Sequence, residues 1–106
     1  TRTDVYIIPV GDSSLAGADS LAQTLRSEGV RAELDITGRK IDKQLKAALK
    51  KGIPFAVFVG ENEISTGTYT VKNLIDSTEQ KIGVDRMVSV VTDHRYDGDE
   101  DAAFNL

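Results

Sequence analysis

The stretch that decides the fold is residues 30–59, VRAELDITGRKIDKQLKAALKKGIPFAVFV. Its first part, residues 30–36, alternates apolar and polar side chains and predicts a half-buried strand. Residues 39–51 have apolar side chains at helical spacing and are followed by Gly52, so they predict a helix. Residues 55–59 form a continuous apolar run, which is typical of a central strand covered on both faces. This order predicts parallel strands joined by a right-handed crossover.

Upstream of this stretch the sequence predicts one more strand and one more helix. Residues 4–10 form a short apolar run that predicts a buried strand. Pro9 is expected at the end of that strand, because proline lacks the N–H group that a strand ladder needs. Residues 15–25 have apolar side chains at helical spacing, and Gly29 is the expected end of this helix. The helix at residues 39–51 is expected to bury an apolar stripe made of Ile41, Leu45, Ala48 and Leu49.

Downstream of residue 59 the pattern changes to antiparallel pairing. Residues 60–63 are expected to form a loop, and residues 68–74 and 80–83 the two strands of a hairpin. Residues 85–91 predict a short last helix. The chain is therefore expected to be an α/β domain in which about three helices pack on a mixed sheet of five strands.

The composition is that of one soluble globular domain. Of the 106 residues, 40% are hydrophobic and 28% charged, and no cysteine is present, which excludes disulfides and thiolate metal sites. No apolar run reaches the roughly 18 residues that a membrane span needs. Residues 1–4 lack a signal-peptide pattern and an initiator methionine. We therefore expect a fragment or a processed piece of a cytoplasmic protein.

The negative charge is concentrated near the C-terminus. The chain has 17 acidic and 13 basic residues, a net charge of −4. Residues 93–101 contain five acids and one base, which leaves 12 of each elsewhere. We therefore expect a folded domain at residues 1–92 and an acidic, disordered tail at residues 93–106, in which His94 is solvated.

The sequence contains no recognisable catalytic constellation. With one histidine and no cysteine it has neither a nucleophilic triad nor a two-histidine zinc pattern. Neither GxGxxG nor GxxxxGK[ST], the glycine-rich phosphate loops, is present. Glu61 and Glu63 follow the central strand, but nothing indicates that they are desolvated as a catalytic pair. The chain by itself is therefore expected to have no catalytic residues, metal site or cofactor.

Two groups of side chains are candidates for binding RNA. The first is a basic cluster at residues 39–51, made of Arg39, Lys40, Lys43, Lys46, Lys50 and Lys51. Of these, Lys40, Lys43, Lys46 and Lys50 are expected on one flank of the second helix. Such a face can neutralise RNA phosphates, although a charged outer face is more often simply the solvated side of an amphipathic helix. The second group follows the central strand and continues on the next one: Glu61, Glu63, Lys72 and Asn73. These side chains can hydrogen-bond the edges of unstacked bases, or they can form a solvated loop and a polar strand face.

Three segments, taken in order, carry a family resemblance. They are residues 5–12 (VYIIPVGD), residues 29–63 (GVRAELDITGRKIDKQLKAALKKGIPFAVFVGENE) and residues 67–74 (GTYTVKNL). This series resembles the C-terminal anticodon-binding domain of histidyl-tRNA synthetases. The synthetases for threonine, proline and glycine have related domains. The run TGRKIDKQLKAA and the segment VKNL favour histidine, because threonyl and prolyl enzymes tend to have an arginine-rich strand at the position of VKNL.

The resemblance implies a three-layer α/β/α domain that recognises a tRNA anticodon. By position, Glu63 matches a family residue that contacts an anticodon base, and Lys72 matches the basic residue on the next strand. Arg39 and Lys43 match positions on the anticodon-facing turn and helix. Gln44 matches a residue that bonds the backbone near that turn.

The resemblance also implies a larger parent protein. That parent would be a homodimeric, cytoplasmic histidine–tRNA ligase whose separate catalytic domain uses ATP and histidine, with Mg. The expected partners of the domain are the anticodon stem-loop of histidine tRNA and this catalytic domain, and neither a membrane nor DNA. The alternative is a synthetase-like regulatory module that senses RNA or dimerises without aminoacylation.

Overall fold

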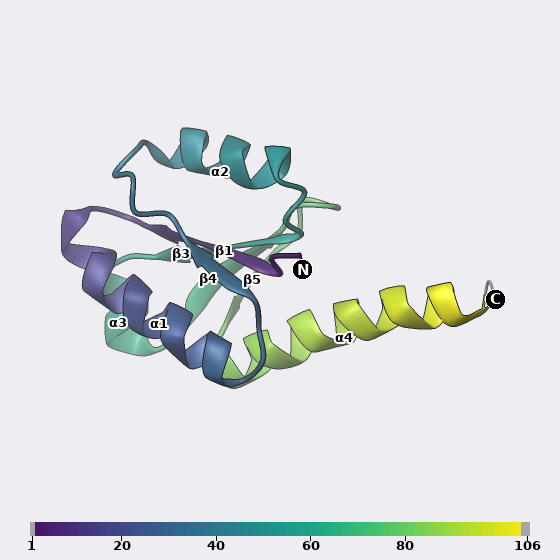
Figure 1. The fold of residues 1–106 in the computed structure, drawn as a ribbon. Coiled ribbons are helices and arrows are strands. Elements are labelled where there is room, and N and C mark those ends of the chain that lie inside the picture. Colours follow the sequence, from purple (N-terminus) through teal and green to yellow (C-terminus); the bar gives the residue numbers. More distant parts are fainter. Residues whose placement is uncertain (1, 105–106) are drawn as a thin grey trace.

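The computed structural model describes the backbone of residues 2–104 and the side chains of residues 2–95. Helices and strands alternate in the first half of the chain, and a β-hairpin and a long helix complete it (Figure 1). In chain order the elements are β1 (Val5–Pro9), the 3-10 helix η1 (Asp12–Ser14), α1 (Leu15–Ser27), β2 (Ala32–Leu34), α2 (Ile41–Lys50), β3 (Phe55–Val59), α3 (Glu61–Thr66), β4 (Tyr69–Asn73), β5 (Glu79–Ile82) and α4 (Val84–Phe104).

The strands of the described chain form one mixed sheet of five in the order β2-β1-β3-β4-β5. β1 pairs in parallel with β2 and β3, whereas β4 is antiparallel to β3 and β5 is antiparallel to β4. The ends of β1 and β3 therefore lie side by side, with Pro9 opposite Val59. This end of the sheet is termed the carboxyl edge. The opposite end, where Val5 pairs with Phe55, is termed the amino edge.

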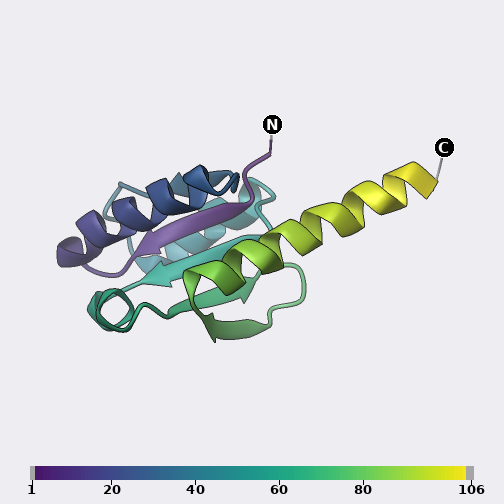
Figure 2. The ribbon, with the colours of Figure 1, turned by 90° about the horizontal axis from the view of Figure 1, so that it is seen from below.

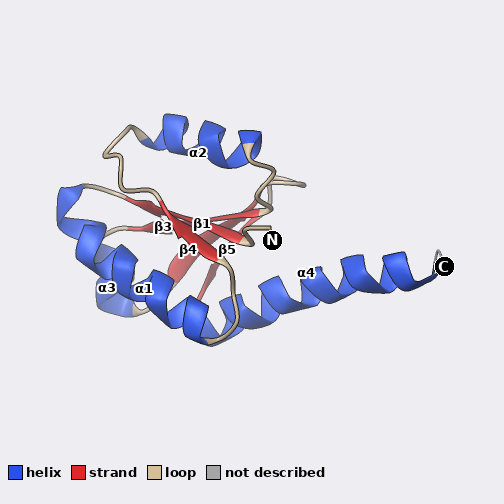
Figure 3. Cartoon of the chain, viewed as in Figure 1, coloured by secondary structure: helices blue, strands red, loops and turns tan. Residues whose placement is uncertain are grey.

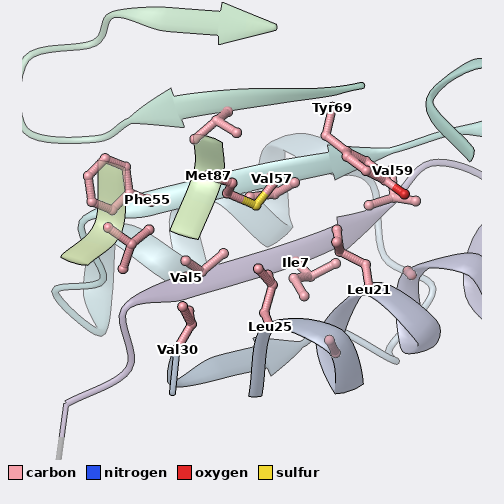
Figure 4. Packing of buried hydrophobic residues seen from close by; sticks show 14 residues of the cluster. Val5, Ile7, Leu21, Leu25, Val30, Phe55, Val57, Val59, Tyr69 and Met87 are labelled. Atoms are coloured by element: carbon pink, nitrogen blue, oxygen red, sulfur yellow. The ribbon is translucent and has the colours of Figure 1, made fainter. Parts of the chain in front are cut away.

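Helices cover both faces of the sheet. α1 and α4 lie on one face and α2 on the other (Figure 3). β1 is buried from both sides, because Val5 and Ile7 point into the core under α1 and α4 while Tyr6 and Ile8 point toward α2. The larger core, shown in Figure 4, also contains Leu21, Leu25, Val57, Tyr69 and Met87. The predicted α/β class with a mixed sheet is confirmed. Within the described residues, no helix is long and apolar enough to cross a membrane.

The segment expected to be a loop after the central strand is a short helix, so that prediction is wrong. Residues 61–66 form α3, which brings the α-helices of the described chain to four rather than about three. The side chain of Glu63 accepts a hydrogen bond from the Gly60 N–H at 2.8 Å and so caps the start of the helix. Gly67, with a left-handed φ of 73°, ends it. Six residues are too few to produce a recognisable helical period.

The apolar stripe predicted for α2 is only partly correct. Ala48 is buried and Leu45 half-buried, but Ile41 and Leu49 are 39% and 56% exposed. Gln44 takes their place against the sheet, with 2% of its surface exposed. Its Nε2 donates to the Arg39 carbonyl oxygen at 2.5 Å, whereas its Oε1 has no hydrogen-bond partner among the described residues. That bond sets the rotation of α2 and confirms the role that the resemblance implied for Gln44.

The last helix is longer than the sequence predicted. It was expected to end near Val91, whereas α4 continues to Phe104. Figure 2 shows its last turns extending beyond the body of the domain. The helix therefore crosses the boundary expected between residues 92 and 93. The side chains of residues 96–106 lie outside the described residues, and the separation of an acidic tail as a unit of its own stays a prediction.

Two side chains that were assigned to the tail pack on the body instead. The ring of His94 lies edge-on against Phe55, with the ring centroids 5.3 Å apart, although the residue remains exposed to solvent as expected. Arg95 pairs with the carboxylate of Asp4 and donates to the Gly29 carbonyl at 3.2 Å. Periodicity cannot show these contacts, because their partners are distant in the sequence.

The core assignment leads to a stability prediction. Leu25 is fully buried between α1 and the sheet, so Leu25→Ala should lower the free energy of unfolding by about 2–5 kcal/mol. Leu49→Ala is the matched control and should cost less than about 1 kcal/mol, since its side chain is already largely in water. Urea denaturation followed by circular dichroism measures both. If Leu49→Ala lowered the free energy of unfolding as much as Leu25→Ala, the orientation of α2 described above, in which Leu49 is exposed, would be wrong.

Candidate nucleic-acid interface

Three turns meet at the carboxyl edge of the sheet. The turn after β1 lies in the middle, the turn between β2 and α2 on one side of it, and the start of α3 on the other. The Ser13 hydroxyl donates to Glu61 Oε1 at 2.9 Å and so ties the central turn to α3. On the other side, Asp12 and Arg39 line a common small cavity. The structure therefore brings Arg39 and Glu61, which are distant in the sequence, to one edge.

A buried carboxylate holds Arg39 in place. The side chain of Asp35 has no exposed surface, and its Oδ2 accepts hydrogen bonds from the Tyr6 hydroxyl at 2.7 Å and from Arg39 Nη2 at 3.1 Å. Its Oδ1 accepts hydrogen bonds from the backbone N–H and the hydroxyl of Thr37. The Thr37 hydroxyl in turn accepts a hydrogen bond from Arg39 Nε at 2.8 Å. The guanidinium is thus fixed at the edge while 42% of the Arg39 side chain remains exposed.

This network shifts two pKa values in opposite directions. Burial raises the pKa of Asp35, but the hydrogen bonds from Thr37, Tyr6 and Arg39 outweigh it and lower the pKa to about 2. Burial, together with the hydrogen bond to Asp35, raises the pKa of Tyr6 to about 12. Both shifts stabilise the pair in which Asp35 is ionised and Tyr6 is neutral. That pair is the form present at neutral pH.

The acids of α3 lie at the same edge but differ in their contacts. Glu61 is exposed and bonded to Ser13, as described above. Glu63 is half-buried, and one of its oxygens is used by the Gly60 N–H. Glu63 therefore shapes the turn in addition to any contact with a ligand.

The basic stripe of α2 consists of exposed side chains on the side of the helix that faces away from the sheet: Lys43, Lys46 and Lys50. α2 begins near the carboxyl edge and ends near the amino edge, so the stripe runs from one edge toward the other (Figure 1). Lys51 does not extend it. Its Nζ pairs with Glu33 at 2.5 Å and lies 5.3 Å from the centre of the Tyr6 ring.

Lys72 and Asn73 do not join the other candidate residues. Because β4 is antiparallel to β3, Lys72 pairs with Ala56 and Asn73 pairs with Phe55, at the amino edge. The length of β3, about 13 Å at the usual rise per residue, separates them from α3. Asn73 Oδ1 accepts a hydrogen bond from the Ile75 N–H at 2.9 Å and stabilises the turn between β4 and β5. Their order in the sequence suggested that Glu61, Glu63, Lys72 and Asn73 form one group. Because β4 runs antiparallel to β3, Lys72 and Asn73 lie at the opposite end of the sheet from the two glutamates.

Sequence reasoning missed two residues of this site, Asp35 and Ser13. A local signal for Asp35 exists in the sequence DITG at residues 35–38, because an aspartate often accepts a hydrogen bond from the N–H two residues later. No local signal points to Ser13, since its partner Glu61 is 48 residues away.

Comparison with known proteins identifies the domain. The family model described as "Anticodon binding domain" matches residues 4–94. The chain belongs to this anticodon-binding family. Within the family it is 36% identical over 92 residues to the histidine–tRNA ligase of Thermococcus kodakarensis, a match that covers 85% of this chain and 21% of that protein. It is also 30% identical over 89 residues to the threonine–tRNA ligase of Methanosphaera stadtmanae, which covers 84% of this chain and 14% of that protein.

A solved structure agrees with the family assignment. The crystal structure of apo S. aureus histidyl-tRNA synthetase matches this anticodon-binding domain with a TM-score of 0.74 and 30% sequence identity. The match covers 85% of this chain and 23% of that one. The chain thus spans about a fifth of the length of the histidine–tRNA ligases that it matches.

The buried Asp35 network gives a prediction about pH. Because the folded-state pKa of Asp35 lies below its usual 3.8, its stabilising effect is complete above about pH 4 and is lost as the pH falls toward 2. Asp35→Asn should therefore lower the free energy of unfolding by about 2 kcal/mol at pH 6. The difference from the unaltered protein should shrink between pH 5 and pH 2 in urea titrations. A difference that stays constant over this range would show that Asp35 does not titrate as described.

Proposed function

We propose that this domain binds the anticodon stem-loop of histidine tRNA as part of a histidine–tRNA ligase. One observation carries the proposal: a fixed, half-exposed arginine and the acids of α3 share one edge of the sheet, beside an exposed lysine stripe, in a domain of the anticodon-binding family. Recognition of single-stranded RNA needs donors and acceptors for base edges, and its affinity depends on cations for phosphates. Both requirements are met within a short distance of the carboxyl edge.

The proposed division of roles follows from position. Arg39, Glu61 and Glu63 recognise splayed anticodon bases at the carboxyl edge. The exposed lysines of α2 bind phosphates of the anticodon stem: Lys43, Lys46 and Lys50. We propose that Lys72 is a further phosphate contact, because its register partner Ala56 places it on the face of the sheet that α2 covers. For Asn73 we propose a structural role in the turn after β4.

The parent protein is part of the same proposal. Matched relatives are about five times as long as the aligned segment, and their names support a ligase that attaches histidine to its tRNA. In this proposal ATP, histidine and Mg act in a separate catalytic domain, and the parent is a cytoplasmic homodimer. Docking of the anticodon on this domain would help to place the acceptor end of the tRNA in that distant active site.

The test of this function is a fluorescence titration of the chain with the histidine anticodon stem-loop. Two further stem-loops serve as comparisons, one that differs only in the anticodon and one with a threonine anticodon, because a threonine–tRNA ligase is also a relative. We expect tighter binding of the histidine loop. Preference for the threonine loop would overturn the assignment of this domain to histidine tRNA. Equal binding of all three loops would favour an RNA-sensing module instead.

Glu63→Gln tests the role of the acid on α3 in the same titration. Glutamine retains an oxygen that can accept the Gly60 hydrogen bond, so the turn is preserved while the charge is removed. The preference for the histidine anticodon should fall by about 5- to 100-fold, the range for one base-edge contact. If Glu63→Gln leaves the preference unchanged, Glu63 only caps α3.

The lysine stripe leads to a separate prediction about salt. Replacing Lys46 by Met should weaken the binding of all stem-loops equally, because a phosphate contact carries no sequence information. It should also reduce the slope of log K against log salt concentration by about 0.7–0.9, the contribution of one neutralised phosphate. Titrations at 50–300 mM salt measure this slope. If Lys43→Met, Lys46→Met and Lys50→Met all leave this slope unchanged, the stripe is a solvated helix face that does not bind phosphates.

A further inference from the structure

A groove at the amino edge is not used by the function proposed above. It is a cavity of about 650 Å³ between the residues before β1, the end of α2, the turn after β4 and the middle of α4, and it is termed the amino-edge groove. None of its lining residues is among those assigned to RNA. The groove is therefore a candidate for a second interaction.

The floor of the groove exposes apolar side chains. Leu49 at the end of α2 is 56% exposed, and Ile75 after β4 is 70% exposed. Leu74 and Pro54 line the same cavity and are half-buried. These side chains come from separate elements, so the tertiary structure brings them together. An exposed apolar patch with polar residues around it marks an interaction surface more often than scattered apolar side chains do.

The rim of the groove carries an excess of positive charge. Arg2, Arg31 and Arg95 line it together with a single acid, Asp4, so two positive charges are left in excess. The Asp4 carboxylate pairs with both Arg31 and Arg95, yet 41% and 34% of these two arginine side chains remain exposed. Such a rim attracts an acidic ligand, and apolar side chains of the same ligand can cover the floor.

The chain itself contains a segment of complementary composition. Residues 97–106 read DGDEDAAFNL, with four acids and no base, and with an apolar end that includes Phe104 and Leu106. α4 lines the groove with His94 and Arg95 and then continues to Phe104, about 13 Å beyond Arg95 at the usual helical rise. Figure 2 shows that this part of the helix runs away from the body. The segment is therefore directed away from the groove of its own chain and toward a second molecule.

We propose that residues 97–106 of one molecule bind in the amino-edge groove of a second molecule, whose own segment binds in the groove of the first. The acids of the segment lie along the arginine rim, and its apolar end packs on the floor formed by Leu49 and Ile75. A two-fold axis makes the two contacts identical, as in most homodimers. Because both contacts form in one complex, each can be weak on its own. The dimer uses the amino edge and leaves Arg39 and Glu63 accessible.

Sedimentation velocity of the unaltered chain tests whether this dimer exists. We expect a monomer–dimer equilibrium that shifts toward the dimer as the protein concentration rises. Salt should weaken the dimer, because screening reduces the attraction between the acidic segment and the arginine rim. A chain that stays monomeric at every concentration, even at low salt, would overturn the inference.

Two substitutions test the groove and the segment separately. Ile75→Asp puts a negative charge on the floor at a largely exposed position, so it should raise the dissociation constant of the dimer at least about tenfold without unfolding the domain. Phe104→Ala removes the largest apolar side chain of the segment and should weaken the dimer in the same way. Ile36→Asp is the matched control, because Ile36 is 73% exposed at the opposite edge, and it should leave the dimer unchanged. Circular dichroism checks that each variant is folded.

Mixing the two weakened variants shows whether the groove and the segment bind each other. A dimer of Ile75→Asp has two altered grooves, and a dimer of Phe104→Ala has two altered segments. A mixed dimer retains one intact groove opposite one intact segment, so the mixture should associate more tightly than either variant alone. Fluorescence anisotropy of labelled Ile75→Asp titrated with Phe104→Ala measures this recovery. A dimer that withstands Ile75→Asp, or a mixture that shows no recovery, would mean that another surface forms the dimer and would overturn the inference.

Discussion

The parallel pairing of β1 with both β2 and β3 is the constraint on which the rest of the structure depends. Parallel neighbours require crossover connections, and these are right-handed. The chain moves from β1 to β2 in one direction and then back past β1 to β3, so the two crossover helices lie on opposite faces. This change of direction buries β1 from both sides. It also leaves a small cavity between the turns that follow β1 and β2.

The two edges of the sheet have different characters as a result. At the carboxyl edge the turns after β1, β2 and β3 come together, and their polar side chains remain partly exposed. At the amino edge Asp4 pairs with Arg31, which precedes β2, and with Arg95 of α4, while a cavity lies between the start of β1, the end of α2 and α4. Burial raises the pKa of Asp4, but hydrogen bonds from Arg31 and Arg95 outweigh it and lower the pKa. One edge is thus suited to recognition, and the other anchors the long C-terminal helix.

Preorganisation is the feature that connects the fold to the candidate interface. Tyr6 lies in the buried strand β1, and its hydroxyl reaches Asp35 in the turn after β2. Asp35 in turn orients the guanidinium of Arg39, and Gln44 holds the backbone of the same residue. Restricting an arginine before its ligand arrives reduces the entropy lost on binding. The position of Arg39 is therefore set by the core of the domain and not by the surface alone.

The sequence by itself determined the class of fold, the central strands and the positions of most elements. Residues 55–59 could be recognised as a covered strand because burial on both faces requires an uninterrupted apolar run. The basic stripe of α2 could also be predicted, since its spacing follows the helical period. Only the tertiary structure decided which of the candidate residues lie together. The antiparallel direction of β4 moved Lys72 and Asn73 away from Glu63, and the rotation of α2 buried Gln44 in place of Leu49. The contacts of Asp35 with Tyr6, of Ser13 with Glu61 and of Arg95 with Asp4 join distant parts of the sequence. Local periodicity carries no information about such partners.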